Sequence, residues 1–285
     1  MKVLRVGACV VAVLAVMTGS ALAQSRPLVT EDPETVPAGN ILFEAGVDFA
    51  HGAVYPASGL TGNLKRIGTF GFSFGVSSIA EIQLDGGVRD LLSIKTTDPN
   101  APLAGMLTLT NPEHTSDFED LSIGAKVRFA EETASRPSMA VRFSTRLPNA
   151  GNESGLGMDT TDFHFGFALG KTVQSVRFVG NFGFGILPDP VRGDRQNDVI
   201  DFGFSAARAV RPDVELVGEL NGRKNTRSGE PPIGTESRAA LRLGSRMTRG
   251  HVRVDAALML GITEFDPSWG LTAGVTWVFK GFDVK

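Results

Sequence analysis

The sequence has four histidines and one cysteine that could carry acid–base or nucleophilic chemistry. Cys9 lies in the N-terminal apolar stretch, and only His164 falls in the middle of a patterned segment. Asp162 lies two residues before it, and Ser144 belongs to the preceding patterned segment. A serine hydrolase needs its nucleophile and base within hydrogen-bond reach, together with an oxyanion donor. Sequence spacing establishes none of these distances, so we expect no enzyme and place a lipid hydrolase third among three functional hypotheses.

The charged residues of many segments fall in the polar register of an alternating pattern, as in a wall that faces water. The acidic members lie early in the chain: Glu44, Asp48, Glu81 and Asp85. The basic members follow in two groups: Lys126, Arg128, Arg142 and Arg146, then Arg238, Arg242 and Arg246. Arg and Lys lining a narrow passage raise the local concentration of anions. These residues are the candidate lining of a solute pathway.

Two of these cations are predicted to lie opposite each other. If the chain turns about Ala134, Lys126 faces Arg142 on the next segment. Like charges directly opposite destabilise a sheet, so either an anionic solute lies between them or Glu81 and Asp85 pair with them. The first alternative predicts a pore and the second a plug. Further along, Glu215 and Glu219 are expected beside Arg242 and Arg246, where pairing of adjacent strands favours structural ion pairs.

The sequence gives little indication of metals or cofactors. It contains no His/Cys cluster with the spacing of a zinc site and no calcium-loop motif. The loop over 149–162 holds Glu153, Asp159 and Asp162 among glycines and could bind calcium, although a solvated loop is the better interpretation. We expect no metal and no cofactor.

The first 23 residues read as an export signal. Lys2 and Arg5 precede an apolar stretch, and Ala21-Leu22-Ala23 is a cleavage pattern. Removing the signal leaves 26 basic and 31 acidic residues, so there is no basic excess for binding nucleic acid. The mature chain also has no cysteine for a disulfide.

Beyond the signal, apolar and polar residues alternate with a period of two, which is typical of amphipathic strands. A clear example is Leu121, Ile123, Ala125, Val127 and Phe129, which alternate with Asp120, Ser122, Gly124, Lys126 and Arg128. We predict twelve such strands, centred near Val47, Phe72, Leu84, Ala125, Phe143, Phe165, Phe182, Phe202, Leu216, Leu241, Ala256 and Ala273. The apolar register holds most of the 19 phenylalanines, and the charges lie in the other register.

The connections between these strands alternate in length. Longer ones are expected over 52–62, 95–116, 149–160, 188–197, 224–235 and 263–267, with short turns between them. This is the layout of an outer-membrane β-barrel with short periplasmic turns and long extracellular loops. Trp269 and Trp277 bracket the last strand and suit the two aromatic girdles. An exported β-sandwich is the alternative, since alternation does not say which face is inside.

The prediction divides the chain into three parts. Residues 1–23 are the signal peptide, 24–40 an extended periplasmic lead-in with three prolines, and 41–280 an all-β, transmembrane, antiparallel up-and-down barrel. Localisation in a Gram-negative outer membrane follows, with outer-membrane lipid as a partner. Twelve strands lie between barrels that side chains fill and barrels that hold an aqueous channel, so the strand number leaves the pore size open.

Two stretches of sequence resemble a known family. Residues 30–40, running into Phe43-Glu44-Ala45-Gly46, are similar to the opening of a family of exported bacterial transporter barrels, grouped with the outer-membrane proteins of the phenol-degradation meta pathway. Leu147-Pro148-Asn149-Ala150, together with 155–162, is similar to a segment from the middle of that family. The resemblance implies a channel or transport role and no catalytic residues.

The function predicted first is therefore a passive channel or transport protein for small solutes, with anionic and aromatic ones as candidates. A non-enzymatic structural or surface-interaction barrel with a plugged lumen is second. The sequence identifies neither the solute nor the oligomeric state.

Overall fold

The computed structural model describes residues 25–284, and the predicted signal peptide lies outside them. The chain forms thirteen strands in one antiparallel sheet, joined by loops that hold two short 3-10 turns, η1 (Ala104–Met106) and η2 (Asn152–Ser154). The strands are β1 (Asn40–Tyr55), β2 (Leu60–Gly75), β3 (Ala80–Thr97), β4 (His114–Asp117), β5 (Ser122–Ala130), β6 (Ser138–Arg146), β7 (Asp162–Val173), β8 (Val176–Pro188), β9 (Gln196–Arg211), β10 (Val214–Asn225), β11 (Arg238–Arg249), β12 (Val252–Gly261) and β13 (Trp269–Lys280).

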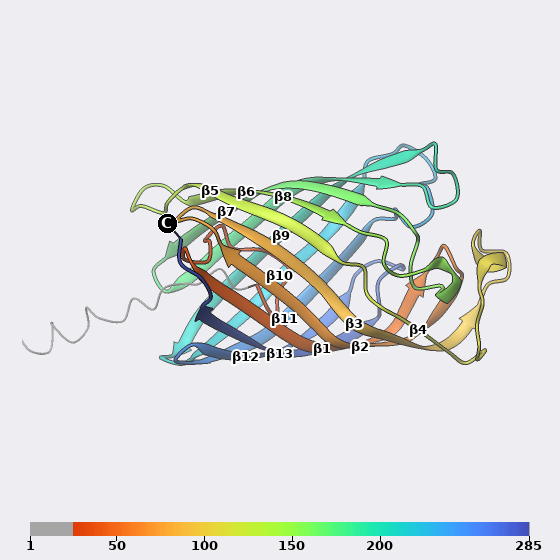
Figure 1. Ribbon diagram of the computed structural model, residues 1–285, viewed down its shortest axis with the longest axis horizontal. Coiled ribbons are helices and arrows are strands. Elements are labelled where there is room, and N and C mark those ends of the chain that lie inside the picture. Colours follow the sequence, from red (N-terminus) through yellow and green to blue (C-terminus); the bar gives the residue numbers. More distant parts are fainter. Residues whose placement is uncertain (1–24, 285) are drawn as a thin grey trace, which may run out of the picture.

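Twelve of these strands close into a barrel (Figure 1). Each pairs with the next along the chain, and β1 pairs with β13 to close the ring. The extra strand, β4, pairs with the outer part of β3, within the loop predicted over 95–116. All twelve predicted strand centres lie in barrel strands, so the predicted fold class is confirmed.

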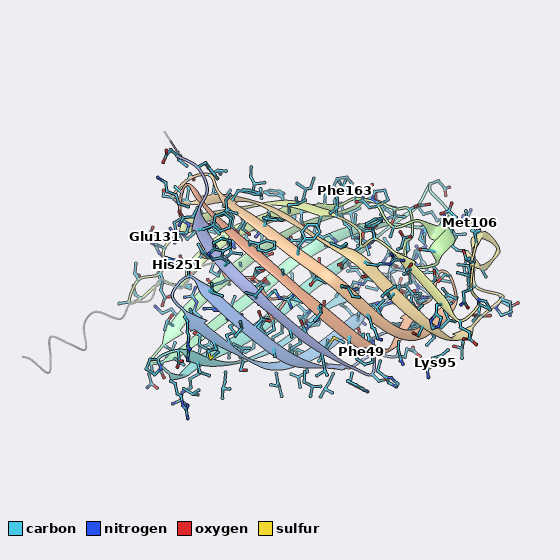
Figure 2. All side chains as sticks on the ribbon, turned by 60° about the horizontal axis from the view of Figure 1, so that its bottom comes forward. Phe49, Lys95, Met106, Glu131, Phe163 and His251 are labelled. Carbon is cyan, nitrogen blue, oxygen red and sulfur yellow. The ribbon has the colours of Figure 1, made fainter. Side chains whose placement is uncertain are left out.

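The two registers of each strand face opposite sides of the wall. On β5 and β6, Ile123 and Phe143 are 47% and 55% exposed on the outer wall, whereas Lys126 is 2% exposed. Figure 2 shows the side chains of Phe49 and Phe163 on the outside of the ribbon. Apolar side chains outside and charged ones inside match a wall that meets lipid on one face and water on the other.

A bulge in the middle of β2 breaks this pattern. Gly46 pairs with Thr69 but Val47 pairs with Ile67, so Gly68 is the extra residue, with a φ of 69° that favours glycine. The bulge resets the alternation of β2, and Lys65 therefore faces outward opposite Phe49. The apolar register predicted for this strand begins at Gly68. It does not apply to the residues before the bulge, where the other register faces outward.

The two ends of the barrel differ in the way that the connection lengths predict. Asn40 at the start of β1 pairs with Lys280 at the end of β13, and short turns such as 76–79 share that end. Figure 2 shows Glu131 and His251 there, with Lys95 and Met106 at the opposite end. The first predicted long loop, over 52–62, is instead mostly strand, because β1 and β2 continue to Tyr55 and Leu60.

Residues 25–39, which belong to the stretch 24–40 predicted as an extended periplasmic lead-in, are hydrogen-bonded to residues of the inner barrel wall. The segment has no regular secondary structure (Figure 1). Val36 is fully buried and packs with Leu42 of β1 and Val278 of β13. A second apolar cluster lies near the long loops, where Leu60, Leu64 and Leu92 are buried against partly buried side chains such as Leu156.

Among residues 25–284, no helix has the length and apolar character needed to cross a membrane.

Candidate functional site

The interior of the barrel is the candidate site, and residues 25–39 occupy part of it. A chain without regular structure must find partners for its backbone N–H and C=O groups when it is buried. Side chains on the inner wall supply them. Glu219 of β10 accepts hydrogen bonds from the backbone N–H of Val29 at 2.9 Å and of Thr30 at 2.6 Å. Its side chain also pairs with Arg242 of β11 at 2.9 Å.

Three further wall residues bind the backbone of the segment. Asn181 of β8 accepts from the N–H of Glu31 and donates to its carbonyl oxygen, both at 2.8 Å. Glu81 of β3 accepts from the N–H of Val36 at 2.6 Å. Arg246 of β11 donates to the carbonyl oxygens of residues 25 and 26, both at 2.7 Å. The segment is thus fixed to the wall on several sides.

The side chains of the segment carry the opposite charge to the basic wall. Lys126 and Arg142 are register partners, as predicted, and Glu31 of the segment lies near both. Lys126 also pairs with Glu81 at 3.0 Å, which is one of the ion pairs expected from the plug alternative. Asp85, the other predicted acid, lies 3.8 Å from Arg142.

Two more acids of the segment extend this pairing. Glu34 forms an ion pair with Arg128 of β5. Asp32 accepts two hydrogen bonds from Arg177 of β8, at 2.7 and 2.8 Å. Arg177 also pairs with Glu132, in the turn between β5 and β6.

Glu132 lies outside the membrane-spanning strands. Burial would raise the pKa of its carboxyl group, but the backbone N–H of Thr172 and the charges of Arg177 and Lys171 lower that pKa below its ordinary value of 4.5. The carboxylate is therefore charged at neutral pH. Its ion pair with Arg177 links the short-turn end of the wall to the side chain that binds Asp32.

A cavity of about 910 Å³ lies inside the barrel between residues 26–31 and the long loops. Of the sequence-predicted site residues, six line it: Asp48, Lys126, Arg142, Arg146, Arg238 and Arg242. The other five are not among its lining residues: Glu44, Glu81, Asp85, Arg128 and Arg246. Glu44, for example, accepts hydrogen bonds from Ser25 and Thr276. The predicted residues thus divide between the cavity and the surroundings of the segment.

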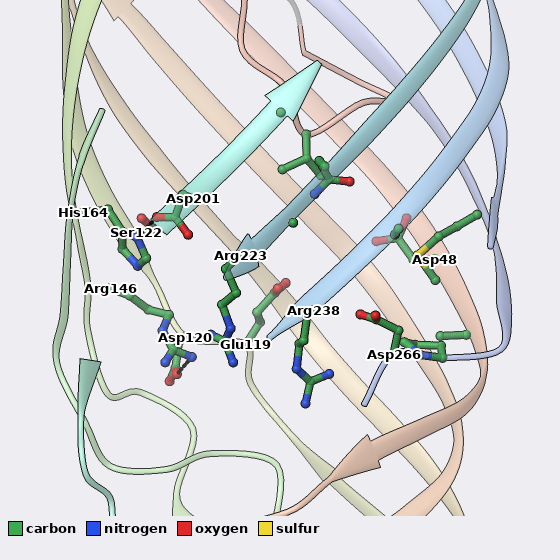
Figure 3. A pocket seen from close by; sticks show the side chains of 18 of the residues that line it. Asp48, Glu119, Asp120, Ser122, Arg146, His164, Asp201, Arg223, Arg238 and Asp266 are labelled. Atoms are coloured by element: carbon green, nitrogen blue, oxygen red, sulfur yellow. Dashed lines mark hydrogen bonds and ion pairs between the residues drawn. The ribbon is translucent and has the colours of Figure 1, made fainter. Parts of the chain in front are cut away.

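Several lining residues of the cavity were missed by the sequence reasoning (Figure 3). Arg66 of β2 lies 3.6 Å from Asp90 and 3.4 Å from Glu119, and its position depends on the bulge at Gly68. Arg223 binds the carbonyl oxygens of the loop over 234–236. These residues lie where strands meet long loops, beyond the clearest part of the period-two pattern. Acidic residues in the same parts of the sequence were the feature from which charged lining residues could have been predicted there.

The histidine that could serve catalysis is held by an aspartate of another strand. His164 Nδ1 lies 2.7 Å from Asp201 of β9, whereas Asp162 pairs with Arg146. Ser144 is the register partner of His164, as expected of neighbouring strands. The hydrogen bonds among residues 25–284 include none between Ser144 and His164, so this geometry does not form a serine–histidine nucleophile.

A closed antiparallel barrel with an apolar outer wall and a charged interior is the fold of outer-membrane β-barrel proteins. Among solved structures, the fold is similar to an outer-membrane channel from Pseudomonas putida F1, with 13% identity over 87% of this chain and 98% of that one and a TM-score of 0.59. The translocator domain of the autotransporter NalP from Neisseria meningitidis is 12% identical over 84% of this chain and 88% of that one, with a TM-score of 0.49. The NanC porin is 8% identical over 84% and 99% of the two chains, with a TM-score of 0.48.

No family model matches the sequence, and no curated protein matches it either. The likeness to the channel from Pseudomonas putida F1 supports the barrel fold.

Proposed function

We propose that the protein is a passive channel for small solutes in the outer membrane of a Gram-negative bacterium. The observation that carries this proposal is the cavity of about 910 Å³, which runs inside the barrel from the long loops to residues 26–31. A barrel filled by its own side chains would leave no such space. The similar fold of a protein described as an outer-membrane channel supports the proposal.

Residues 25–39 would act as the restricting element of this channel. They are joined to the inner wall by hydrogen bonds and ion pairs. Because all these contacts are noncovalent, the segment can shift without breaking a covalent bond. Solutes that pass beside it must be small, and no residue of the pathway is required to react with them.

The charges along the pathway favour mild selectivity. Glu31, Asp32 and Glu34 balance much of the basic wall that the sequence alone suggests as an anion site. The rest of the cavity lining carries both signs, including Arg146 and Asp120, which pair at 3.1 Å. We therefore propose small polar solutes with a weak preference for anions. Aromatic solutes remain a prediction from the sequence.

A structural barrel with a closed lumen is the second candidate. It is favoured by the number of inner-wall residues that bind the segment, of which Glu81 at 1% exposure and Lys126 at 2% are the most buried examples. Single-channel recording in planar bilayers separates the two candidates. The channel predicts stable ohmic steps, and the closed barrel predicts silence.

Lipid hydrolysis is the third candidate and has the least support, because His164 faces the interior and binds Asp201. Hydrolysis of phospholipid by the purified protein, abolished in His164→Ala, would be required to favour it. A barrel that conducts and does not hydrolyse phospholipid supports the channel.

A further inference from the structure

Two neighbouring cations lie on the outer, apolar wall of the barrel, on β2 and β3. Lys65 of β2 pairs with Phe49 and Leu91, and Arg89 of β3 pairs with Ile67, which is 48% exposed. Both cations are exposed, and their positions are diagonal neighbours on one face. This outward pair exists because the bulge at Gly68 resets the alternation of β2.

The outward cations differ from the inward ones in their partners. Within residues 25–284, neither Lys65 nor Arg89 forms an ion pair with a carboxylate, and Arg89 donates a hydrogen bond to Ser116 Oγ at 2.9 Å. By contrast, Lys126 and Arg142 on the inner wall each pair with acids. A positive charge on a lipid-facing wall is costly at the bilayer centre but favourable beside anionic headgroups.

The outward cations lie near the level of a headgroup layer. Trp269 stacks on His51 at the long-loop end of the outer wall, in the place of an aromatic girdle. Leu271 is two residues further into the wall, and the ladder then runs from Leu271 through Phe49 to Lys65. The strands tilt relative to the barrel axis (Figure 1). Each step from one strand to the next in this ladder therefore lies about 3 Å nearer the long-loop end, whereas the two residues from Trp269 to Leu271 lead about 5 Å away from that end. The displacements nearly cancel, which places Lys65 close to the level of Trp269.

A groove on the outer wall leads away from this cation. Ser245, Ala256 and Ala273 are consecutive partners across β11, β12 and β13, and they form a row of small side chains. Rows of larger side chains border it on both sides: Leu243, Leu258 and Leu271, then Met247, Val254 and Val275. The groove has a volume of about 810 Å³, and its lining extends to Phe49, Lys65 and Ile67. Followed from β2 toward β11, the groove approaches the short-turn end of the barrel.

We propose that this groove and the pair Lys65 and Arg89 bind one phosphorylated lipid of the outer leaflet. The two cations bind its phosphate, and one of its acyl chains lies in the groove between the rows of leucine and valine. Charge complementarity at one end, an apolar trough at the other and the headgroup level of the cations all fit this occupant. A neutral lipid would leave the cations unpaired, and a second copy of the chain would place its own cations beside these.

Native mass spectrometry of the purified protein with added lipid A, in its diphosphoryl and its dephosphorylated form, tests the proposal. We expect the wild-type protein to retain diphosphoryl lipid A preferentially. Each cation near an anionic lipid contributes about a fivefold factor in affinity, so the double variant Lys65→Gln/Arg89→Gln should bind about thirtyfold more weakly. Ala256→Phe, which fills the groove and keeps the outer face apolar, should weaken retention without changing the charge.

The matched control is Arg249→Gln, which removes an exposed cation at the short-turn end. Arg249→Gln should leave the retention of lipid A unchanged, and a heat-modifiability gel shift should show that all variants fold. Equal retention of the two lipid forms, or undiminished retention by the folded double variant, would overturn the proposal. A shift from dimer to monomer in the double variant, without any retained lipid, would assign the surface to a second copy of the chain.

Discussion

Glu31 Oε1 lies 2.8 Å from Arg142 Nε, and the other carboxylate oxygen lies 3.7 Å from Lys126 Nζ. Arg142 and Lys126 are directly opposite each other on β6 and β5, so their mutual repulsion requires a negative charge nearby. Glu31, from outside the barrel strands, provides part of it, beside Glu81 and Asp85 of β3. The basic wall and the segment before β1 are therefore one electrostatic unit.

Glu31→Gln should weaken the attachment of residues 25–39 by about 1–3 kcal/mol, because it leaves the buried Lys126 and the partly exposed Arg142 facing each other with less negative charge between them. The check is the temperature at which the folded form is lost in heat-modifiability gels. Glu113→Gln is the control, since Glu113 lies exposed in the loop before β4. Identical transitions for both variants would show that Glu31 contributes nothing.

The outer wall can be tested by charge. Phe143→Arg or Val127→Arg places a cation against lipid and should cost about 2–4 kcal/mol, which blocks assembly. The predicted tolerant variant from sequence alone is Ser144→Arg, but Ser144 is buried, with 8% exposure. Ser122→Arg is the better control because Ser122 lines the cavity. If outward and inward variants assemble equally well in the gel-shift assay, the assignment of the two faces is wrong.

Selectivity depends on the same basic wall. Arg142→Gln/Arg146→Gln removes two cations and releases Asp120 and Asp162 from pairing with Arg146. We expect the reversal potential in a salt gradient to change from a weak anion preference toward cations. An unchanged reversal potential with intact folding would mean that these residues do not influence permeant ions.

Much of this fold follows from the sequence, for a physical reason. Strand centres and registers were predictable because the period-two pattern records which side chain meets lipid, as in Phe143 and Lys126. The opposition of Lys126 and Arg142 followed from that register. The bulge at Gly68 was missed because one inserted residue leaves both flanking patterns intact.

The position of residues 25–39 could not be read in the same way. The segment has no periodicity, and its attachment depends on hydrogen bonds to Glu219 and Asn181, which are far away in the sequence. The contact of His164 with Asp201 could not be predicted either, because it crosses β8, where Gly185 has no side chain to fill the space beside the ring.

The lowered pKa of Glu132 predicts an acid-sensitive contact at the short-turn end. Its stabilising effect is present above the ordinary pKa of 4.5 and is lost as the pH falls through the lowered folded-state pKa. Glu132→Gln should therefore lower the transition temperature at neutral pH and have little effect in strong acid. A difference that persists unchanged into strong acid would contradict the assignment of the effect to this carboxylate.

The central claim, that residues 25–39 restrict a solute pathway, is most directly tested by a reversible cross-link. Thr30 Cβ lies 3.4 Å from the position of a Cβ at Gly203 of β9, close to the spacing in a disulfide. The only native cysteine, Cys9, is in the predicted signal peptide, so Thr30→Cys/Gly203→Cys would form one disulfide in the mature chain.

Single-channel conductance of this double variant, recorded before and after reduction, is the decisive measurement. We predict small or absent current steps in the oxidised protein and steps like those of the wild type after reduction. Equal steps in both states would show that movement of the segment is not needed for conduction. Silence in both states and in the wild-type protein would contradict the channel and favour the closed structural barrel.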